Sequence, residues 1–390
     1  GHMPAYRPSK GLHNVDDRLF SRGGFHRLDY ALPSVDVSYS SPLLQRAGAA
    51  EHQDATVLDA QGVAWHYGNP LGEQRAAETG TIAIDRSQRR VLRVSGADAP
   101  GFLNNLLTQK LDDAPSGFSA GALDLDIQGH ILHHMDITRA GEDFFLDLPA
   151  AQFESAQDFL TKMVFWSEVM VEEADIAIVT LLGEADIPTP PTVVFSREVQ
   201  WPGIKRVDLA IPREKLVESM AALEAEGARL AGLMAFTAER VRAREPELAA
   251  DLDKKSIPHE VPQWISRSDA DPAHVHLNKG CYRGQETVAR VENLGRSPRL
   301  LVLLHLDGSA PERPNVGDDI SFNGRKVGRI GTIVDDCDFG PIALGLVKRS
   351  ALDAGTLDIG DTAASIDASS IPEDEGPKAG REAVNRLRGR

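Results

Sequence analysis

The most constraining feature of the chain is a change of pattern near Arg299. Before this residue, strand-like segments alternate with helical ones, whereas after it only short strands follow, separated by glycine and proline. Within this last part, Asn323-Gly324 is a strong signal for a two-residue hairpin turn. The pattern predicts a small all-β barrel or sandwich over residues 299–365. From residue 366 the chain is acidic and poor in large apolar side chains, which predicts a mobile tail.

The larger part before Arg299 divides into two units with a similar rhythm of strands and helices. In the first unit, GALDLD and HILHHMDIT alternate apolar and polar residues on either side of Gln128-Gly129, which predicts a hairpin. Asp98 is expected to cap the helix that follows it. Several strands with helices against one face predict an α+β fold. The expected parts are an irregular arm over residues 3–40 and α+β units over 41–170 and 171–298.

The charge of the chain limits its partners. A formal net charge of −16 argues against broad nucleic-acid binding, because such binding needs a basic face. A local basic patch is still expected, and it could attract an anionic small molecule. The residues of this patch are Lys279, Arg283, Arg290, Arg296 and Arg299.

Three observations predict a cytoplasmic protein without membrane contact. The longest apolar runs are far shorter than the ~20 residues of a membrane span. Gly1-His2-Met3 resembles the remnant of an expression tag, and no hydrophobic signal region follows it. The two cysteines are too few for a disulfide framework, which fits a reducing compartment.

The stretch LNKGCYRGQETVAR at 277–290 is too polar and too rich in glycine to be ordinary core. Its Cys281 lies between Lys279 and Arg283, and nearby cations lower the pKa of a thiol, which predicts a reactive cysteine. The alternative is that Cys281 is a small buried residue and that the basic groups point elsewhere. A cysteine hydrolase would need a positioned base, and no hydrolase signature accompanies the stretch. Cys337 has acidic neighbours, which raise a thiol pKa, and is expected to be inert.

Histidines form a second candidate site. HILHHMDIT carries His130, His133 and His134, and His274-x-His276 forms another pair. On a strand, His130 and His134 share a face, and Asp136 would be a third metal ligand on that side. The alternative is that these are solvated or hydrogen-bonded strand histidines. A four-cysteine iron–sulfur cluster would need a partner chain, because this chain has two cysteines.

The segment KGCYRGQE at 279–286 resembles the K-G-C-Y-x-G-Q-E signature of the YgfZ family of folate-binding proteins. This family is related to the glycine-cleavage T protein, an aminomethyltransferase, and to a mitochondrial iron–sulfur assembly factor. Other segments between residues 80 and 350 are also similar to the family. They are LRVSGADAPGFLNNLLT at 92–108, ERVRAREP at 239–246, which places Arg242 at the family's arginine, IPHE at 257–260 and VARVENLGRSPR at 288–299.

The resemblance implies a cloverleaf of two ferredoxin-like parts and a small C-terminal β-barrel around a central channel. It also implies tetrahydrofolate in that channel, where the flat pterin needs hydrogen-bonding groups at one end and the anionic glutamate tail needs arginines at the other. Cys281 and Lys279 are the implied catalytic residues. The implied folate contacts are His134, Asp136, Glu239, Arg242, Tyr282, Gln285, Glu286 and Arg290.

The function that the resemblance implies is accessory: support for the maturation or repair of iron–sulfur enzymes, with Cys281 as the functional thiol and iron–sulfur assembly or client proteins as partners. A folate-dependent one-carbon transferase related to the T protein is the alternative. His134 takes the position of the Asp in that protein's G-G-I-x-x-D-L strand, with Asp136 two residues further on. Loss of the carboxylate argues against aminomethyl transfer. A folate-fold binding module without chemistry is a third alternative, in which Cys281→Ala would leave function unchanged.

Overall fold

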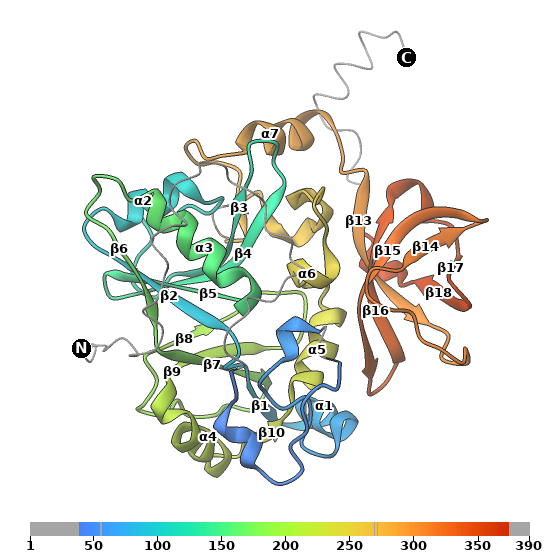
Figure 1. The fold of residues 1–390 in the computed structure, drawn as a ribbon, viewed down its shortest axis with the longest axis horizontal. Helices are drawn as coiled ribbons and strands as arrows, with labels where there is room; N and C mark the ends of the chain where they lie inside the picture. The colour runs from blue at the N-terminus through green and yellow to red at the C-terminus, as the bar shows by residue number, and fades with distance from the viewer. Residues whose placement is uncertain (1–38, 55–56, 269, 271, 374–390) are drawn as a thin grey trace, which may run out of the picture.

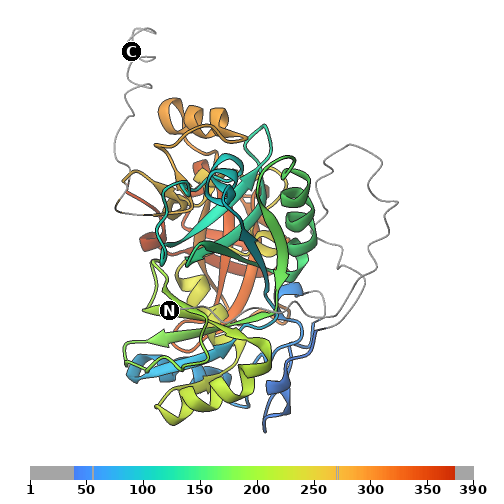
Figure 2. The same ribbon diagram turned by 90° about the vertical axis from the view of Figure 1, so that its left-hand side faces the viewer.

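The computed structural model describes residues 39–54, 57–268, 270 and 272–373. Two five-stranded sheets and a closed six-stranded barrel form its three parts, which confirms the α+β fold with a small C-terminal barrel. In Figure 1 the barrel lies to the right of the two sheets. Figure 2 shows one sheet above the other, with the barrel behind them. Residues 3–38 of the predicted arm and residues 374–390 of the predicted tail lie outside the described residues.

The first sheet is antiparallel, with the strand order β3-β4-β5-β2-β6. Helices α2 and α3 cover one face, and their apolar side chains share a core with the sheet, including Phe102, Leu103 and Phe153. Pairing of β3 with β4 confirms the hairpin across Gln128-Gly129. The elements of this part are β2 (Arg90–Ser95), α2 (Ala99–Leu106), β3 (Ser119–Leu125), β4 (Ile131–Ala140), β5 (Asp143–Leu148), α3 (Ala150–Lys162) and β6 (Met170–Ala174).

Asp98 stands at the predicted position before α2 but does not cap it with its side chain. Its own backbone is helical, with φ −92° and ψ 0°, whereas a capping residue has an extended backbone that turns its side chain back on the first turn. The Asp98 carboxylate instead accepts the backbone N–H of Glu168 at 2.7 Å. The predicted start of the helix after Asp98 is confirmed, but the predicted capping hydrogen bond is wrong. The Asp98 carboxylate instead holds the segment that leads into β6.

The second sheet has the order β10-β1-β7-β9-β8, in which β10 runs parallel to β1 and the other pairs are antiparallel. Helix α4 packs on one face, and α1 and α5 pack on the other. The elements are α1 (Pro70–Thr79), β1 (Thr81–Asp85), β7 (Ile176–Gly183), β8 (Phe195–Glu198), β9 (Arg206–Pro212), α4 (Leu216–Ala225), β10 (Arg229–Ala231) and α5 (Leu233–Arg242).

Strand β1 belongs to the second sheet, although it lies within the predicted first unit, residues 41–170. It precedes β2 in the chain, yet it pairs with β7 and β10 of the second sheet. All five residues of β1 are buried, as expected of a strand with neighbours on both sides. The two sheets are therefore interleaved along the sequence, because the local pattern of a strand does not specify its partner.

The barrel closes in the order β13-β16-β15-β14-β17-β18. Asn323 and Gly324 both have positive φ angles, of 52° and 76°, which confirms the predicted two-residue turn between β14 and β15. Helices α5 and α6 lie between the sheets and the barrel (Figure 1). The remaining elements are α6 (Leu248–Asp251), β11 (Ile265–Ser266), β12 (Val275–His276), α7 (Gln285–Leu294), β13 (Arg299–Leu306), β14 (Asp319–Phe322), β15 (Arg325–Asp336), β16 (Gly340–Lys348), β17 (Thr356–Ile359) and β18 (Thr362–Ile366).

No helix in the ranges that the structure describes is both long and apolar enough to cross a bilayer.

Candidate functional site

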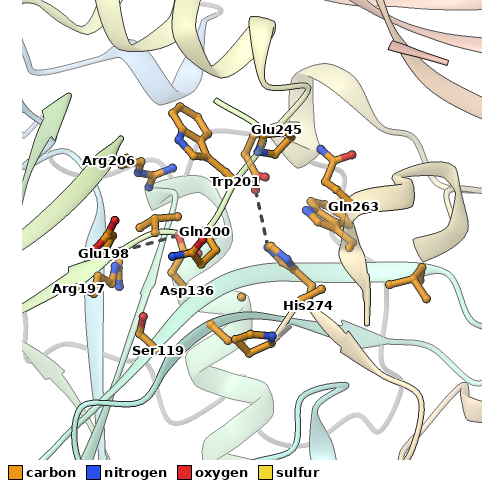
Figure 3. Close-up of a pocket in the computed structure, with 18 of the residues that line it drawn as sticks. Ser119, Asp136, Arg197, Glu198, Gln200, Trp201, Arg206, Glu245, Gln263 and His274 are labelled. Atoms are coloured by element: carbon orange, nitrogen blue, oxygen red, sulfur yellow. Dashed lines mark ion pairs between the residues drawn. The ribbon is translucent and has the colours of Figure 1, made fainter. Parts of the chain in front are cut away.

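A pocket of about 420 Å³ lies where the two sheets meet the segment that connects α5 to β12 (Figure 3). Its volume falls within the usual range of small-molecule sites, roughly 300–1,000 Å³. Strands β3 and β4, the end of β8 with the loop after it, and β9 supply part of the wall, and residues far along the chain supply the rest. The polar and aromatic lining residues are Ser119, Asp136, Arg197, Glu198, Gln200, Trp201, Arg206, Glu245, Gln263, Trp264 and His274.

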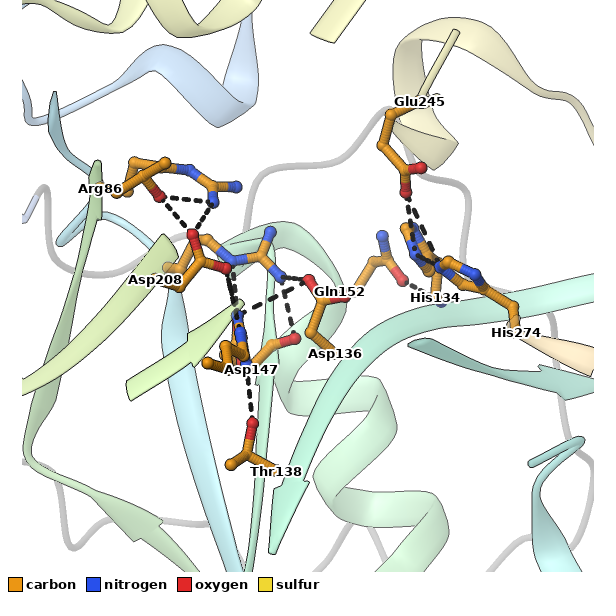
Figure 4. Close-up of polar contacts among 12 residues, drawn as sticks. Arg86, His134, Asp136, Thr138, Asp147, Gln152, Asp208, Glu245 and His274 are labelled. Atoms are coloured by element: carbon orange, nitrogen blue, oxygen red, sulfur yellow. Dashed lines mark hydrogen bonds and ion pairs between the residues drawn. The ribbon is translucent and has the colours of Figure 1, made fainter. Parts of the chain in front are cut away.

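A buried network of arginines and aspartates supports this wall and joins the two sheets (Figure 4). Arg197 of β8 donates to Asp147 of β5 at 2.6 Å and to Asp208 of β9 at 3.0 Å. Arg89 donates to Asp147 at 3.0 Å and to Asp136 at 3.3 Å. Burial opposes ionisation of Asp136, but the charges of Arg197 and Arg89 outweigh it and hold its pKa well below the usual range. Asp136 is therefore a carboxylate at neutral pH and a weak base.

Two histidines from distant parts of the chain meet beside this network. The Nε2 atoms of His134 and His274 are 2.9 Å apart, and both rings lie against Trp264. Burial lowers the pKa of His134 to about 4 and the pKa of His274 well below its ordinary value. Both rings are thus neutral at pH 7, so one Nε2 donates the hydrogen bond and the other accepts it.

Glu245 completes this cluster from the turn after α5. Its Oε1 atom lies 3.6 Å from His134 Nε2 and 3.7 Å from His274 Nε2. Burial raises the pKa of Glu245 to about 7, and the nearby charge of Asp136 adds to the effect. Buried titratable groups that meet in a pocket are typical of functional sites.

The histidines of β4 take different sides of the strand. His133 contacts Asp124 and Ser155, each at 2.7 Å, whereas His134 faces the pocket side with Asp136. His130 precedes β4 and contacts Asp126 through its Nδ1 atom at 3.0 Å. The predicted sharing of one face by His130 and His134 is wrong, because β4 begins only at Ile131 and the register shifts between Asp124 and Leu125. The histidine that lies next to His134 is His274, not the predicted His130.

Cys281 is exposed and does not line the pocket. The burial that the alternative expected is therefore wrong, whereas its other half is confirmed, since the basic groups of Lys279 and Arg283 bind carbonyls and a carboxylate elsewhere. Its loop is fixed by its neighbours: the Lys279 Nζ atom donates to the carbonyls of Asn104 and Leu107 at the end of α2, and Tyr282 is buried in the core. Arg283 donates to Asp124 at 2.9 Å. These contacts hold the loop in place, and the Cys281 thiol is exposed to solvent.

The clamp made by Lys279 gives a testable prediction. Burial lowers the pKa of Lys279 to about 8, so the ammonium group is still largely protonated at pH 7. Lys279→Met leaves two carbonyls without their donor, and we expect a loss of about 1–3 kcal/mol of stability. Hydrogen exchange should become faster in residues 279–284 and at the end of α2, but not in the exposed-lysine control Lys348→Met. Unchanged exchange in both segments would show that the lysine is not needed there.

The structure places the other predicted contacts elsewhere. Glu239 accepts a hydrogen bond from Gln74, and Arg242 pairs with Asp336 of the barrel at 2.5 Å. Gln285 donates to carbonyls of its own loop, and Glu286 and Arg290 are exposed on α7. Of the predicted residues, only Asp136 lines the pocket, with His134 beside it.

Sequence reasoning assigned no role in the pocket to Glu245, Trp201, Gln263 or His274. The one sequence signal is the His274-x-His276 pair, which by itself does not indicate a partner. No local pattern connects His274 to β4, because the two segments are brought together only by the fold.

No protein-family model matches the chain. It is 24% identical over 374 residues to a chloroplastic protein of Arabidopsis thaliana named "Putative transferase", covering 89% of this chain and 82% of that one. It is 24% identical over 270 residues to the tRNA-modifying protein YgfZ of Colwellia psychrerythraea, covering 64% and 80%. An aminomethyltransferase of Xanthomonas oryzae pv. oryzae is 25% identical over 226 residues, covering 50% and 61%.

Among solved structures, the glycine cleavage system aminomethyltransferase T from Bartonella henselae matches 84% of this chain and 95% of its own, with a TM-score of 0.69 and 19% identity. The fold is therefore that of the aminomethyltransferases. The sequence matches and the fold together show that the chain is similar to YgfZ and to the glycine-cleavage aminomethyltransferase.

Proposed function

We propose that this protein binds tetrahydrofolate in the pocket and supports the maturation or repair of iron–sulfur enzymes through Cys281. The observation that carries the proposal is the separation of the two features: the pocket wall contains no cysteine, and the thiol stands on a fixed loop that faces solvent. An exposed thiol can reach a protein partner, whereas a ligand in the pocket can bind without touching it. Iron–sulfur assembly or client proteins would be those partners, in the cytoplasm.

The lining of the pocket suits a folate. Trp201 and Trp264 supply flat apolar surface, and Gln200, Gln263 and Glu245 supply amide and carboxyl groups for the edge of a pterin. Arg206 lies in the same wall and would favour the anionic glutamate tail. His134 and Asp136 stay part of the proposed site. The other predicted folate contacts do not line this pocket, and their contact with folate stays a prediction. These residues are Glu239, Arg242, Tyr282, Gln285, Glu286 and Arg290.

A folate-dependent one-carbon transferase is the second candidate, and the Asp136 carboxylate in the pocket wall favours it. Its ion pairs with Arg89 and Arg197 argue the other way, because a carboxylate held in this manner is a weak proton acceptor. We therefore prefer the accessory function.

Calorimetric titration with tetrahydrofolate tests the ligand. Trp201→Ala removes a flat surface from the pocket wall, and we expect binding to weaken about tenfold, as for a contact of about 1–1.5 kcal/mol. Trp166→Ala is the matched control, because Trp166 is fully exposed and is not part of the pocket lining. Cys281→Ala should bind tetrahydrofolate as the parent protein does. Absence of binding by the parent protein, or equal losses in the two tryptophan variants, would contradict the folate site.

The thiol is tested separately in cells that lack the protein. Cys281→Ala should fail to restore the activity of iron–sulfur enzymes, whereas Cys337→Ala should restore it, because burial and two neighbouring aspartates raise the pKa of Cys337 to about 11. Full restoration by Cys281→Ala would favour the binding module without chemistry.

A further inference from the structure

We propose that His134, His274 and Glu245 form a binding site for a divalent transition-metal ion in the wall of the pocket. The proposal goes beyond folate binding and the function of Cys281. It rests on the convergence of three ligand atoms, one each from β4, the turn after α5 and the residue before β12 (Figure 4).

The three atoms are spaced as metal ligands are. His134 Nε2 and His274 Nε2 are 2.9 Å apart, and Glu245 Oε1 lies 3.6 and 3.7 Å from them. With bonds of about 2.0–2.2 Å, ligand atoms around a tetrahedral or octahedral ion lie roughly 2.9–3.6 Å from one another. An ion between the three atoms therefore needs shifts of only a few tenths of an ångström, by that estimate.

The donor set has the chemistry of known metal centres. Two imidazoles and one carboxylate bind catalytic zinc in several enzymes, and two histidines with one carboxylate on a common face bind non-haem Fe²⁺. Each imidazole can offer the lone pair of its Nε2 atom once the donating ring carries its proton on Nδ1 instead. The metal would then replace the hydrogen bond between the two rings.

Glu245 lacks a cationic partner of its own. Among the described residues, no arginine or lysine nitrogen lies within 4 Å of its carboxylate, and the two histidines are its neighbours at ion-pair distance. A buried carboxylate without a cation is costly. A divalent ion would supply the missing charge. The other charged groups around the cluster are engaged: Asp136 pairs with Arg89 and Arg197, Arg206 with Asp208, and Arg240 with Asp251.

The backbone leaves room for His274 to reach this point. A Cβ atom at Gly121 of β3 would lie 2.0 Å from His274 Nε2, so any larger residue must displace the ring. Gly121 pairs with Asp136 of β4, which places the ring against the hairpin that carries His134. The pocket beside the cluster gives an ion a route of entry and room for further ligands, such as water.

A second group of metal-binding residue types occurs at Glu78, Cys337 and Asp338, where Glu78 is exposed. It has no buried donors and serves here as the control site.

Titration of the metal-free full chain with Co²⁺ tests the proposal, because the visible spectrum of Co²⁺ reports nitrogen and oxygen ligation, and Zn²⁺ competition gives the affinity. We expect one ion per chain, bound at least about 100-fold more weakly by His274→Ala and by the isosteric Glu245→Gln. Gly121→Ala should also weaken binding, although it removes no ligand. Cys337→Ser should bind as the parent chain does.

The result is independent of folate, since the probe is the metal alone and a failure to bind tetrahydrofolate would not change it. Circular dichroism of each variant confirms that the chain is folded. The proposal is overturned if the parent chain gives no Co²⁺ spectrum, if Glu245→Gln and His274→Ala bind as well as the parent, or if Cys337→Ser abolishes binding.

Discussion

Replacing Asp208 by Asn is expected to lower the free energy of unfolding by about 3–5 kcal/mol, as is typical when one partner of a buried ion pair is removed. Asp208 is fully buried, and Arg86, Arg197 and Arg206 all lie within 3.9 Å of its carboxylate. The three arginines outweigh the cost of burial and hold the pKa of Asp208 far below its ordinary value. An asparagine removes the negative charge and turns an N–H₂ group toward guanidinium donors.

Urea unfolding followed by tryptophan fluorescence measures this loss, since all four tryptophans lie outside the barrel. The matched control is Asp186→Asn, whose side chain is 96% exposed and 3.5 Å from Lys205. An exposed pair of this kind is worth at most about 1 kcal/mol. Equal effects of the two substitutions would mean that the buried network does not hold the sheets together.

Asp251→Ala is expected to have a comparable effect, about 3–5 kcal/mol, at the contact between the sheets and the barrel. Asp251 of α6 is buried and accepts hydrogen bonds from Arg240 at 2.9 Å and from the backbone N–H of Thr332 in β15 at 2.7 Å. Without it, Arg240 stays buried with no carboxylate. The barrel should therefore separate from the rest of the chain at lower urea concentration, which far-ultraviolet circular dichroism and limited proteolysis can follow.

Asp335→Ala provides the control for this change, because Asp335 lies on β15, the strand that Asp251 contacts. Asp335 pairs with Arg313 at the surface, where both side chains are more than one-third exposed. We expect a change within about 1 kcal/mol. If Asp251→Ala behaved in the same way, α6 could not be the main attachment of the barrel.

Much of the fold follows from local pattern, and the reasons are visible in particular elements. The hairpin of β3 and β4 and the turn at Asn323-Gly324 were predictable because alternation and turn residues act over a few positions. The place of strand β1 in the second sheet was not predictable, because its local pattern, buried at all five residues, fits a strand in either sheet. The partner of a strand is decided by the whole fold.

The site was less predictable than the fold. Of the folate contacts that the resemblance implies, Asp136 lines the pocket and His134 lies beside it, and the hairpin that carries both is a local structure. Glu245 and His274 come from turns without regular periodicity, and only tertiary packing brings them within 3.7 Å of each other. The motif around Cys281 is visible in the sequence. The exposure of Cys281 is not, because it depends on contacts of Lys279 and Tyr282 with residues far away in the chain.

The interleaving of the two sheets also has a consequence for synthesis on the ribosome. Strand β1 ends at Asp85, whereas its antiparallel neighbour β7 begins only at Ile176. At roughly 5–20 residues per second, translation leaves β1 without that partner for about 5–20 s. During this time the strands β2 to β6 can complete their own sheet, while Ile82 and Ile84 remain open to water, to chaperones and to other nascent chains.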